Sequence, residues 1–295
     1  MGAIFALVTG FCWAAYNLAV RRGLENMDSG TGYVITLVFG SLANIGLLFL
    51  PLPGRGAAMV SAVAVLWFAM SGLVNTIVGR WALFRNIQLV GPSRASAWKN
   101  ATPLYTLVFG FLLLGERPDG FGIAGTACVI AGLFLLSREQ LRANQDSQVK
   151  PVALREVAIL GIVSGMCFSA AMLFRKAGLN HWPDAALGNT IAGLAALVVY
   201  MPYAWKQGET KKITRAPWKG VSAMLLAGAF SALAQLTTFL SLRVTMAATT
   251  QVITALEPLF TMVLSAVILK RSEVLNRSLV GSAAMVCLGV ILMTL

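Results

Sequence analysis

Long apolar stretches without a charged residue dominate the chain. A helix needs about 20 mostly apolar residues to cross a bilayer, and eight stretches approach or exceed that length: 1–20, 31–54, 56–79, 120–137, 157–174, 185–205, 220–242 and 278–295. Two further stretches are interrupted by charge, since 92–114 contains Arg94 and Lys99 and 244–269 contains Glu257. Runs of this length exclude the alternating strands of a membrane barrel. The pattern therefore predicts ten membrane-spanning helices.

Composition supports a membrane protein without a resident cofactor. The chain of 295 residues is 58% hydrophobic and 12% charged, roughly half the charge of a soluble domain. The four cysteines lie inside apolar stretches, and His181 is the only histidine. We therefore expect no disulfide framework, no metal site and no cofactor. The first stretch lacks a basic flank and a cleavage site, so it is interpreted as a span and not as a cleaved signal.

The chain repeats itself with a shift of 155 residues. The segment Gly10-Phe-Cys-Trp-Ala-Ala falls on Gly165-Met-Cys-Phe-Ser-Ala, and Pro103-Leu-Tyr-Thr falls on Pro258-Leu-Phe-Thr. Five spans per half is an odd number, so the second half must enter the membrane from the opposite side. This predicts an all-α inverted repeat with a binding site near the membrane midplane. The expected organisation is a first repeat at 1–137, a polar connection at 138–156 and a second repeat at 157–295.

The distribution of basic residues predicts the orientation. Of the 23 Lys and Arg, five fall on the even-numbered connections, which leaves 18 for the odd-numbered ones; the five are Arg55, Arg117, Arg175, Lys176 and Arg243. Cytoplasmic loops carry the excess of positive charge. We therefore expect the odd-numbered connections in the cytoplasm and both termini outside. The net charge of +12 is explained by this topology, so we expect lipid as a partner and no nucleic acid.

Two motifs resemble the EamA-type domain of the drug/metabolite transporter superfamily. One is Pro103-Leu-Tyr-Thr-Leu-Val-Phe-Gly-Phe-Leu-Leu-Leu-Gly-Glu-Arg, followed by Gly125 and Gly132; the other is Ala255-Leu-Glu-Pro-Leu-Phe-Thr, followed by Gly281 and Gly289. The resemblance implies a pseudo-two-fold bundle with a central cavity in a bacterial inner membrane. It also implies transport of small metabolites, often as export. The second half departs from the pattern, because Gly115 and Glu116 fall on Lys270 and Arg271. Members are often drawn with cytoplasmic termini, whereas the charge distribution places these termini outside.

Glu257 is the most distinctive candidate for chemistry. It lies well inside the ninth apolar stretch, where a carboxylate costs several kcal/mol unless it faces water or a partner. One interpretation is a group that binds a proton or a substrate ammonium. The alternative is a structural glutamate that hydrogen-bonds helix backbone near Pro258.

Two basic residues lie inside the third and fourth spans. Lys99 and Arg80 could together clamp a carboxylate or a phosphate. Alternatively, both long side chains extend to the membrane interface, as such side chains commonly do.

Aromatic and amide side chains accompany these groups. Trp98 lies seven residues before Tyr105 and shares a helical face with it. Such residues either line a cavity or pack and anchor the helices. The candidates for a substrate site are Trp13, Tyr16, Trp81, Trp98, Tyr105, Gln235 and Gln251, with Asn17, Asn75 and Asn100 as further polar positions. Trp182, Trp205 and Trp218 are interpreted as interface anchors.

These features together predict a secondary transporter that moves a small polar organic metabolite, amino acid-like or anionic, by alternating access, with export as the expected direction. No metalloprotease motif, Ser–His pair or Asp pair points to an enzyme. The alternative is a membrane receptor or assembly component that does not transport. The oligomeric state stays open, and a monomer is compatible with the sequence.

Overall fold

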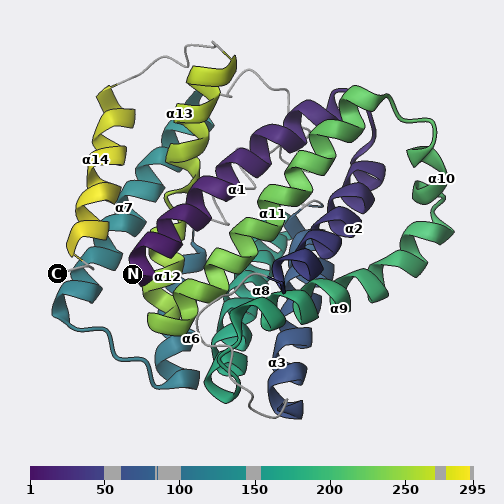
Figure 1. Ribbon diagram of the computed structural model, residues 1–295. Coiled ribbons are helices and arrows are strands. Elements are labelled where there is room, and N and C mark those ends of the chain that lie inside the picture. Colours follow the sequence, from purple (N-terminus) through teal and green to yellow (C-terminus); the bar gives the residue numbers. More distant parts are fainter. Residues whose placement is uncertain (50–60, 84, 86–100, 144–153, 270–276, 293–295) are drawn as a thin grey trace. The chain divides into compact units, whose positions relative to one another are not determined.

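The computed structural model describes residues 1–49, 61–83, 85, 101–143, 154–269 and 277–292, and the regular elements within these ranges are helices (Figure 1). They are α1 (Gly2–Leu24), α2 (Ser29–Leu47), α3 (Ala62–Leu73), the π-helix η1 (Val74–Gly79), α6 (Thr102–Leu114), α7 (Gly120–Ala143), α8 (Leu154–His181), α9 (Ala185–Lys206), α10 (Glu209–Ile213), α11 (Trp218–Val244), α12 (Ala247–Thr254), α13 (Glu257–Leu269) and α14 (Arg277–Leu292).

Seven helical segments in the described part of the chain are long and apolar enough to cross a membrane. They are Gly2–Leu24, Ser29–Leu47, Ala62–Leu83, Glu156–His181, Ala185–Lys206, Trp218–Val244 and Ala247–Ser265. Each overlaps a stretch predicted from the sequence, and large apolar side chains are exposed along them. This confirms a polytopic α-helical membrane protein.

The chain forms two compact units, each assembled from segments far apart in the sequence. Unit 1 contains Met1–Leu73, Phe174–Val244 and Leu256–Arg271, whereas unit 2 contains Val74–Leu173, Thr245–Ala255 and Ser272–Leu295. Helix α8 contributes its first part to unit 2 and its last turns to unit 1.

In unit 1, α1 packs antiparallel along α11 (Figure 1). The hydroxyls of Thr9 and Thr237 are 2.8 Å apart, and the Ser241 hydroxyl donates to the carbonyl of Gly2 at 2.9 Å. At the opposite end of the pair, Gly23 lies against the side chain of Met224. Small residues allow the two helices to approach closely. The hydrophobic effect does not drive helices together inside a lipid bilayer, so hydroxyl contacts of this kind help to hold them together.

The interior of unit 1 combines aromatic packing with one buried amide pair. The rings of Phe68 and Phe239 lie 5.6 Å apart, and both side chains are fully buried. The Asn189 amide donates to the side-chain oxygen of Asn44 at 2.9 Å and thereby joins α9 to α2. A satisfied pair of this kind fixes the register of the two helices.

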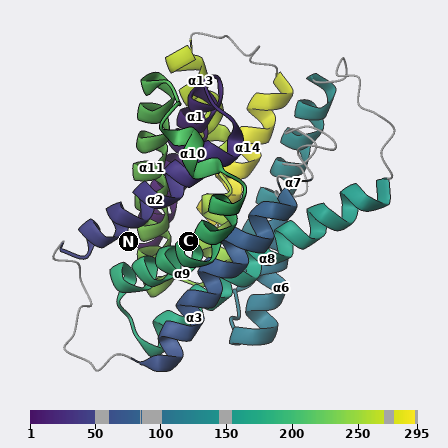
Figure 2. The same cartoon turned by 90° about the vertical axis from the view of Figure 1, so that its right-hand side faces the viewer.

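In unit 2, α7 and α14 pack antiparallel through glycines (Figure 2). A side-chain carbon added at Gly132 would meet the Ser282 carbonyl oxygen at 3.0 Å, and one added at Gly289 would meet the Gly125 carbonyl oxygen at 2.5 Å. The helix backbones therefore touch directly at two points along the pair.

The motif that ends α6 has a structural role in unit 2. Gly115 adopts a left-handed conformation (φ 65°), and the backbone N–H of Glu116 closes the helix end on the carbonyl of Gly110 at 3.1 Å. The Glu116 carboxylate then accepts from the N–H of Ala247 at 2.7 Å and of Ala248 at 3.4 Å. It therefore caps the N-terminus of α12, where a negative charge is favourable.

Removing this cap is expected to destabilise unit 2. Glu116→Ala leaves two N–H groups of α12 without their acceptor, which costs about 1–2 kcal/mol. We expect a lower midpoint of thermal unfolding in detergent, whereas Arg117→Ala, a change at the exposed neighbour, should leave the midpoint unchanged. Equal midpoints for the two variants would contradict the capping role.

Three details differ from the sequence-based expectations. Helix α8 continues past the predicted end at 174 as far as His181, so Arg175 and Lys176 lie in a helix and not in a connection. Helix α7 runs to Ala143 and α8 begins at Leu154, so both extend into the polar connection expected at 138–156. Trp182 is only 7% exposed and is therefore buried within the protein; its interpretation as an interface anchor is wrong.

Candidate functional site

The ninth apolar stretch is a broken helix. Helix α12 ends at Thr254 and α13 begins at Glu257, with Ala255 and Leu256 in a turn between them. Pro258 explains the break, because proline lacks the N–H that would continue the ladder of hydrogen bonds and its ring restricts the preceding residue. Glu257 therefore stands in the first turn of a half-helix.

The Glu257 carboxylate is hydrogen-bonded to a neighbouring helix of unit 1. The side-chain amide of Asn17 on α1 donates to Glu257 Oε1 at 2.8 Å. Glu257 lies in the first turn of α13, where the positive end of the helix dipole favours a negative charge. A half-buried carboxylate at a break in a spanning helix is the arrangement in which transporters commonly place a binding group.

The predicted aromatic residue Trp13 shares the helical face of Asn17, and Tyr16 contacts its ring. The rings of Trp13 and Tyr16 are 5.2 Å apart and meet edge to face. Trp13 lies four residues before Asn17, a spacing that puts both on one side of α1. Six residues before Asn17, Phe11 packs against Phe260 of α13 with ring centroids 6.1 Å apart. The contact between α1 and α13 therefore combines aromatic rings with one carboxylate.

Gln235 also belongs to unit 1, on α11. Its side-chain oxygen is buried and accepts no hydrogen bond from the described part of the chain. Buried polar atoms are nearly always satisfied, so this oxygen is a candidate acceptor for an N–H or O–H group of a ligand.

The remaining predicted residues do not gather around Glu257 within unit 1. Arg80, Trp81, Tyr105 and Gln251 belong to unit 2. Trp81 is 62% exposed. The ring of Tyr105 packs on Gly165 of α8, where an added side-chain carbon would lie 2.7 Å from it. Trp98 and Lys99 lie outside the described residues.

The sequence reasoning missed Arg175 as a buried cation. It is 6% exposed, and its guanidinium lies 5.4 Å from the ring centroid of Phe239, a cation–π distance. Its position directly after an apolar stretch led to its assignment to a connection. The sequence signal that could have revealed it is the apolar Ala177-Gly178-Leu179 that follows.

Arg175 and Glu257 lie at different levels of unit 1. Thr9 of α1 lies opposite Thr237 of α11. Because the two helices are antiparallel, Asn17, eight residues further along α1, lies opposite a part of α11 well before Thr237. Arg175 lies beside Phe239, just beyond Thr237. At 1.5 Å per residue the two levels are separated by roughly 15 Å along the helices.

Helices of this length with exposed apolar surfaces define a polytopic membrane protein. The sequence matches the EamA-like transporter family twice, over residues 1–138 and 156–295. The chain therefore belongs to the EamA-like transporter family.

Relatives named as transporters agree with this assignment, and a solved structure shares the fold. The chain is 28% identical over 129 residues to an uncharacterized transporter of Helicobacter pylori, and 26% identical over 145 residues to the uncharacterized transporter YcxC of Bacillus subtilis. These matches cover 41% and 45% of the chain and 40% and 44% of the relatives, so the chain spans less than half of the length of each relative it matches. A solved crystal structure has a similar fold. Its TM-score is 0.73 at 16% identity, and the match covers 100% of this chain and 98% of that one.

The chain is thus a multi-pass integral membrane protein with transporters as relatives. Its bacterial relatives point to a plasma membrane.

Proposed function

We propose that the chain is a secondary transporter that exports a small polar organic metabolite, amino acid-like or anionic, by alternating access. The observation that carries the proposal is the Asn17–Glu257 hydrogen bond at the break between α12 and α13. It sets an ionisable group inside a spanning segment, beside a half-helix terminus. Ionisable residues at such positions are costly and serve substrate and proton pathways.

The proposed architecture is ten spans in two inverted repeats, 1–137 and 157–295. The seven long spans are joined by the shorter apolar helices Thr102–Leu114 and Gly120–Leu135 and by α14, which makes ten. The two family matches at 1–138 and 156–295 support a duplication.

Packing in unit 1 also supports the inverted repeat. Gly23 of α1 lies against Met224 of α11, and Gly178 of α8 lies against Phe68 of α3. The shift of 155 residues converts Gly23 into Gly178 and Met224 into Ala69, the neighbour of Phe68. Equivalent glycines in the two halves thus make equivalent helix contacts. The antiparallel pairing of α7 with α14, the fifth spans of the two halves, is of the kind that inversion produces.

Each site residue has a proposed role that follows from the chemistry of its side chain. Glu257 accepts a proton or the ammonium group of the substrate, and Asn17 holds its carboxylate in place. The Trp13 and Tyr16 rings give a cation or a flat solute a polarisable surface. The buried Gln235 oxygen accepts a further hydrogen bond.

The proposal is tested by solute flux into vesicles reconstituted with the purified full-length chain. A panel of radiolabelled amino acids and phosphorylated sugars is offered with and without an imposed pH gradient. We expect at least one solute to accumulate above its level in protein-free vesicles and a protonophore to abolish that accumulation. Absence of net flux and of counterflow for the entire panel would overturn the proposed substrate class.

A further inference from the structure

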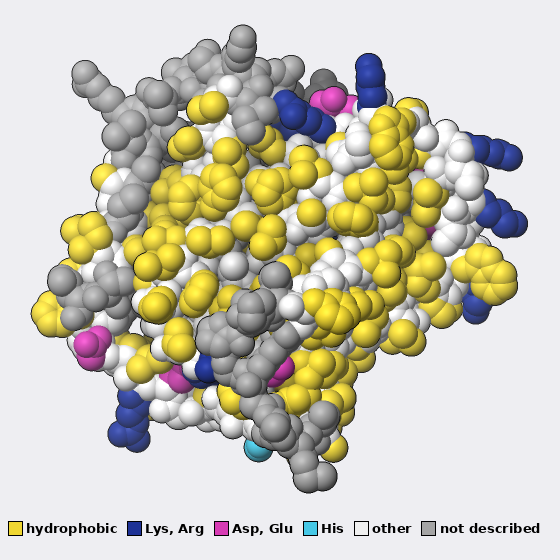
Figure 3. All heavy atoms as spheres, viewed as in Figure 1, with side chains coloured by type: hydrophobic (Ala, Val, Ile, Leu, Met, Phe, Trp, Pro, Cys, Tyr) yellow, Lys and Arg dark blue, Asp and Glu magenta, His cyan; other side chains and the backbone are white. Residues whose placement is uncertain are grey.

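Positive charge is concentrated at one end of unit 1. The segments 21–28 and 206–219 together contain seven Lys and Arg against three Asp and Glu; the cations are Arg21, Arg22, Lys206, Lys211, Lys212, Arg215 and Lys219. We call these seven residues the basic patch. At the other ends of α1, α2, α9 and α11, the charged side chains that the structure describes are Asp184 and Arg243, and Arg175 and Lys176 of α8 contact the end of α11. Several Lys and Arg side chains lie at the edge of the molecule where α10 lies (Figure 3).

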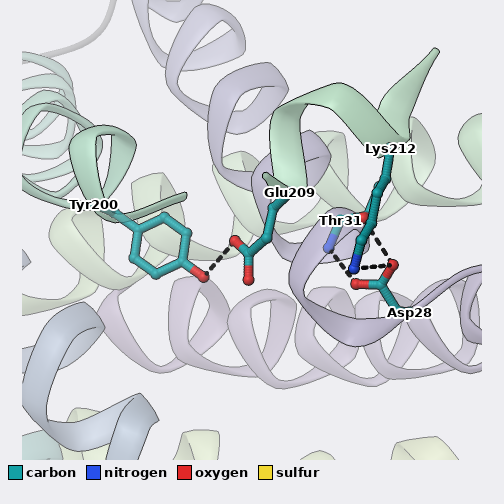
Figure 4. Close-up of polar contacts among 5 residues, drawn as sticks. All are labelled: Asp28, Thr31, Tyr200, Glu209 and Lys212. Atoms are coloured by element: carbon teal, nitrogen blue, oxygen red, sulfur yellow. Dashed lines mark hydrogen bonds and ion pairs between the residues drawn. The ribbon is translucent and has the colours of Figure 1, made fainter. Parts of the chain in front are cut away.

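Helix α10 is fixed against the start of α2 and the end of α9 (Figure 4). Lys212 forms an ion pair with Asp28 at 3.6 Å, and the Tyr200 hydroxyl donates to the Glu209 carboxylate at 3.2 Å. A side-chain carbon at Gly30 would collide with the Glu209 carboxylate. The basic patch is therefore presented on a docked helix and not on a freely extended loop.

The pKa values of the two carboxyl groups beside α10 shift in opposite directions. The N–H of Thr31 lowers the pKa of Asp28, with its hydroxyl and Lys212 assisting, and Asp28 is thus held as an ion that anchors Lys212. Burial raises the pKa of Glu209, with the Asp28 charge adding to the effect, and a raised carboxyl pKa disfavours the negative form.

The other cations of this linker point to an external anion. The side chains of Lys206, Lys211, Arg215 and Lys219 are exposed and form no hydrogen bond or ion pair within the described residues. Trp205 and Trp218 flank the linker with exposures of 71% and 72%. Exposed tryptophans at the ends of two spans mark the level of the lipid headgroups. The basic patch consequently lies where the phosphates of a leaflet lie.

We propose that the basic patch binds the headgroups of anionic phospholipids in the leaflet that it faces. Charge complementarity supports this assignment. Each Lys or Arg near the membrane surface raises the affinity of a polybasic segment for anionic lipid about fivefold. The flanking tryptophans hold the segment at the headgroup level, and the Lys212–Asp28 ion pair keeps α10 oriented. A free phosphate or a soluble acidic partner would need no such interfacial tryptophans.

The test measures which lipids the purified full-length chain retains. Protein in neutral detergent is equilibrated with equimolar phosphatidylglycerol and phosphatidylcholine, and bound lipid is counted by native mass spectrometry. We expect enrichment of phosphatidylglycerol that weakens as salt is raised. The triple variant Lys206→Gln, Lys211→Gln, Arg215→Gln should lose about one to two orders of magnitude of that preference.

A charge-preserving variant supplies the matched control. Lys206→Arg, Lys211→Arg, Arg215→Lys should retain the preference, and unchanged thermal unfolding in neutral detergent shows that both triple variants fold. Equal lipid preference in the wild type and the neutralised variant would overturn the proposal. Polyglutamate is then added as a competitor of phosphatidylglycerol. Competition only at a far higher concentration of charge supports a lipid site. Competition at an equal concentration of charge would overturn the lipid proposal in favour of a soluble acidic partner.

Discussion

Glu257→Gln is expected to abolish accumulation of the substrate driven by a pH gradient while substrate exchange across the membrane continues. Glutamine keeps the size and the hydrogen-bonding oxygen of the protonated acid, and Asn17 can still donate to that oxygen. It cannot release a proton, so the link between proton and substrate is lost. We expect the loss of gradient-driven accumulation to exceed tenfold, which corresponds to more than about 1.4 kcal/mol of coupling free energy.

Two controls make this result specific. Glu25→Gln removes an exposed carboxylate outside the spans and should leave both activities unchanged. Asn17→Ala removes the donor to Glu257 while the carboxyl group stays, so gradient-driven accumulation should weaken and shift its pH dependence without disappearing.

A second version of the hypothesis pairs Glu257 with a cation. Lys99, from the fourth apolar stretch, is the candidate, and it lies outside the described residues. If the two form a pair that the substrate disrupts, Glu257→Gln should impair exchange as well as accumulation, because it leaves an uncompensated charge. Lys99→Met in the same variant should then restore part of the exchange.

The opposite outcome is equally definite. Normal accumulation with normal pH dependence in Glu257→Gln, at normal expression, would falsify both versions. Glu257 would then be a structural residue that joins α13 to α1 through Asn17, and the proposed proton coupling would have to be assigned to another group.

The positions of the spans could be predicted because membrane helices obey a simple rule of length and polarity. Backbone groups in lipid must be paired internally, so a charge-free apolar stretch near 185–205 becomes a helix, here α9, with little influence from its neighbours. The prediction worked less well where charge ends a stretch. Lys176 donates to the backbone carbonyl of Leu242 at 2.6 Å, and such a contact with a distant segment allows α8 to continue through two cations.

The candidate site was only partly predictable because it too depends on contacts between distant segments of the chain. The sequence identified Glu257 by its cost inside the membrane, but its partner is 240 residues away and no local pattern specifies it. Pro258 could have suggested the helix break, since proline disfavours a continuous helix. The aromatic residues were the least predictable. Trp13 and Trp81 occupy similar apolar surroundings in the sequence, but in the folded protein Trp81 is 62% exposed, whereas Trp13 packs on Tyr16.

The glycines of α14 show most clearly what packing adds to a sequence motif. Gly281 and Gly289 both belong to the motif that the sequence shares with its family, and nothing in the local sequence separates them. A side-chain carbon at Gly289 would lie 2.5 Å from the carbonyl oxygen of Gly125 and 2.9 Å from the backbone nitrogen of Val129. A carbon at Gly281 would meet nothing within 4 Å.

Gly289→Ala is therefore expected to destabilise the protein, and Gly281→Ala, on the same helix, is the matched control. The atoms that oppose the new methyl group at Gly289 are helix backbone of α7, which can yield only if the helices separate. Overpacking of this kind costs about 1–3 kcal/mol, or a fall of about 2–10 °C in the midpoint of thermal unfolding. The alanine at 281 faces open space, so the midpoint should stay within about 1 °C or rise slightly, because alanine favours a helix over glycine. The two variants differ from the wild type by the same methyl group at sites eight residues apart. A similar fall in both midpoints, measured in the same detergent, would show that the direct contact of Gly289 with α7 does not set the stability of this helix pair.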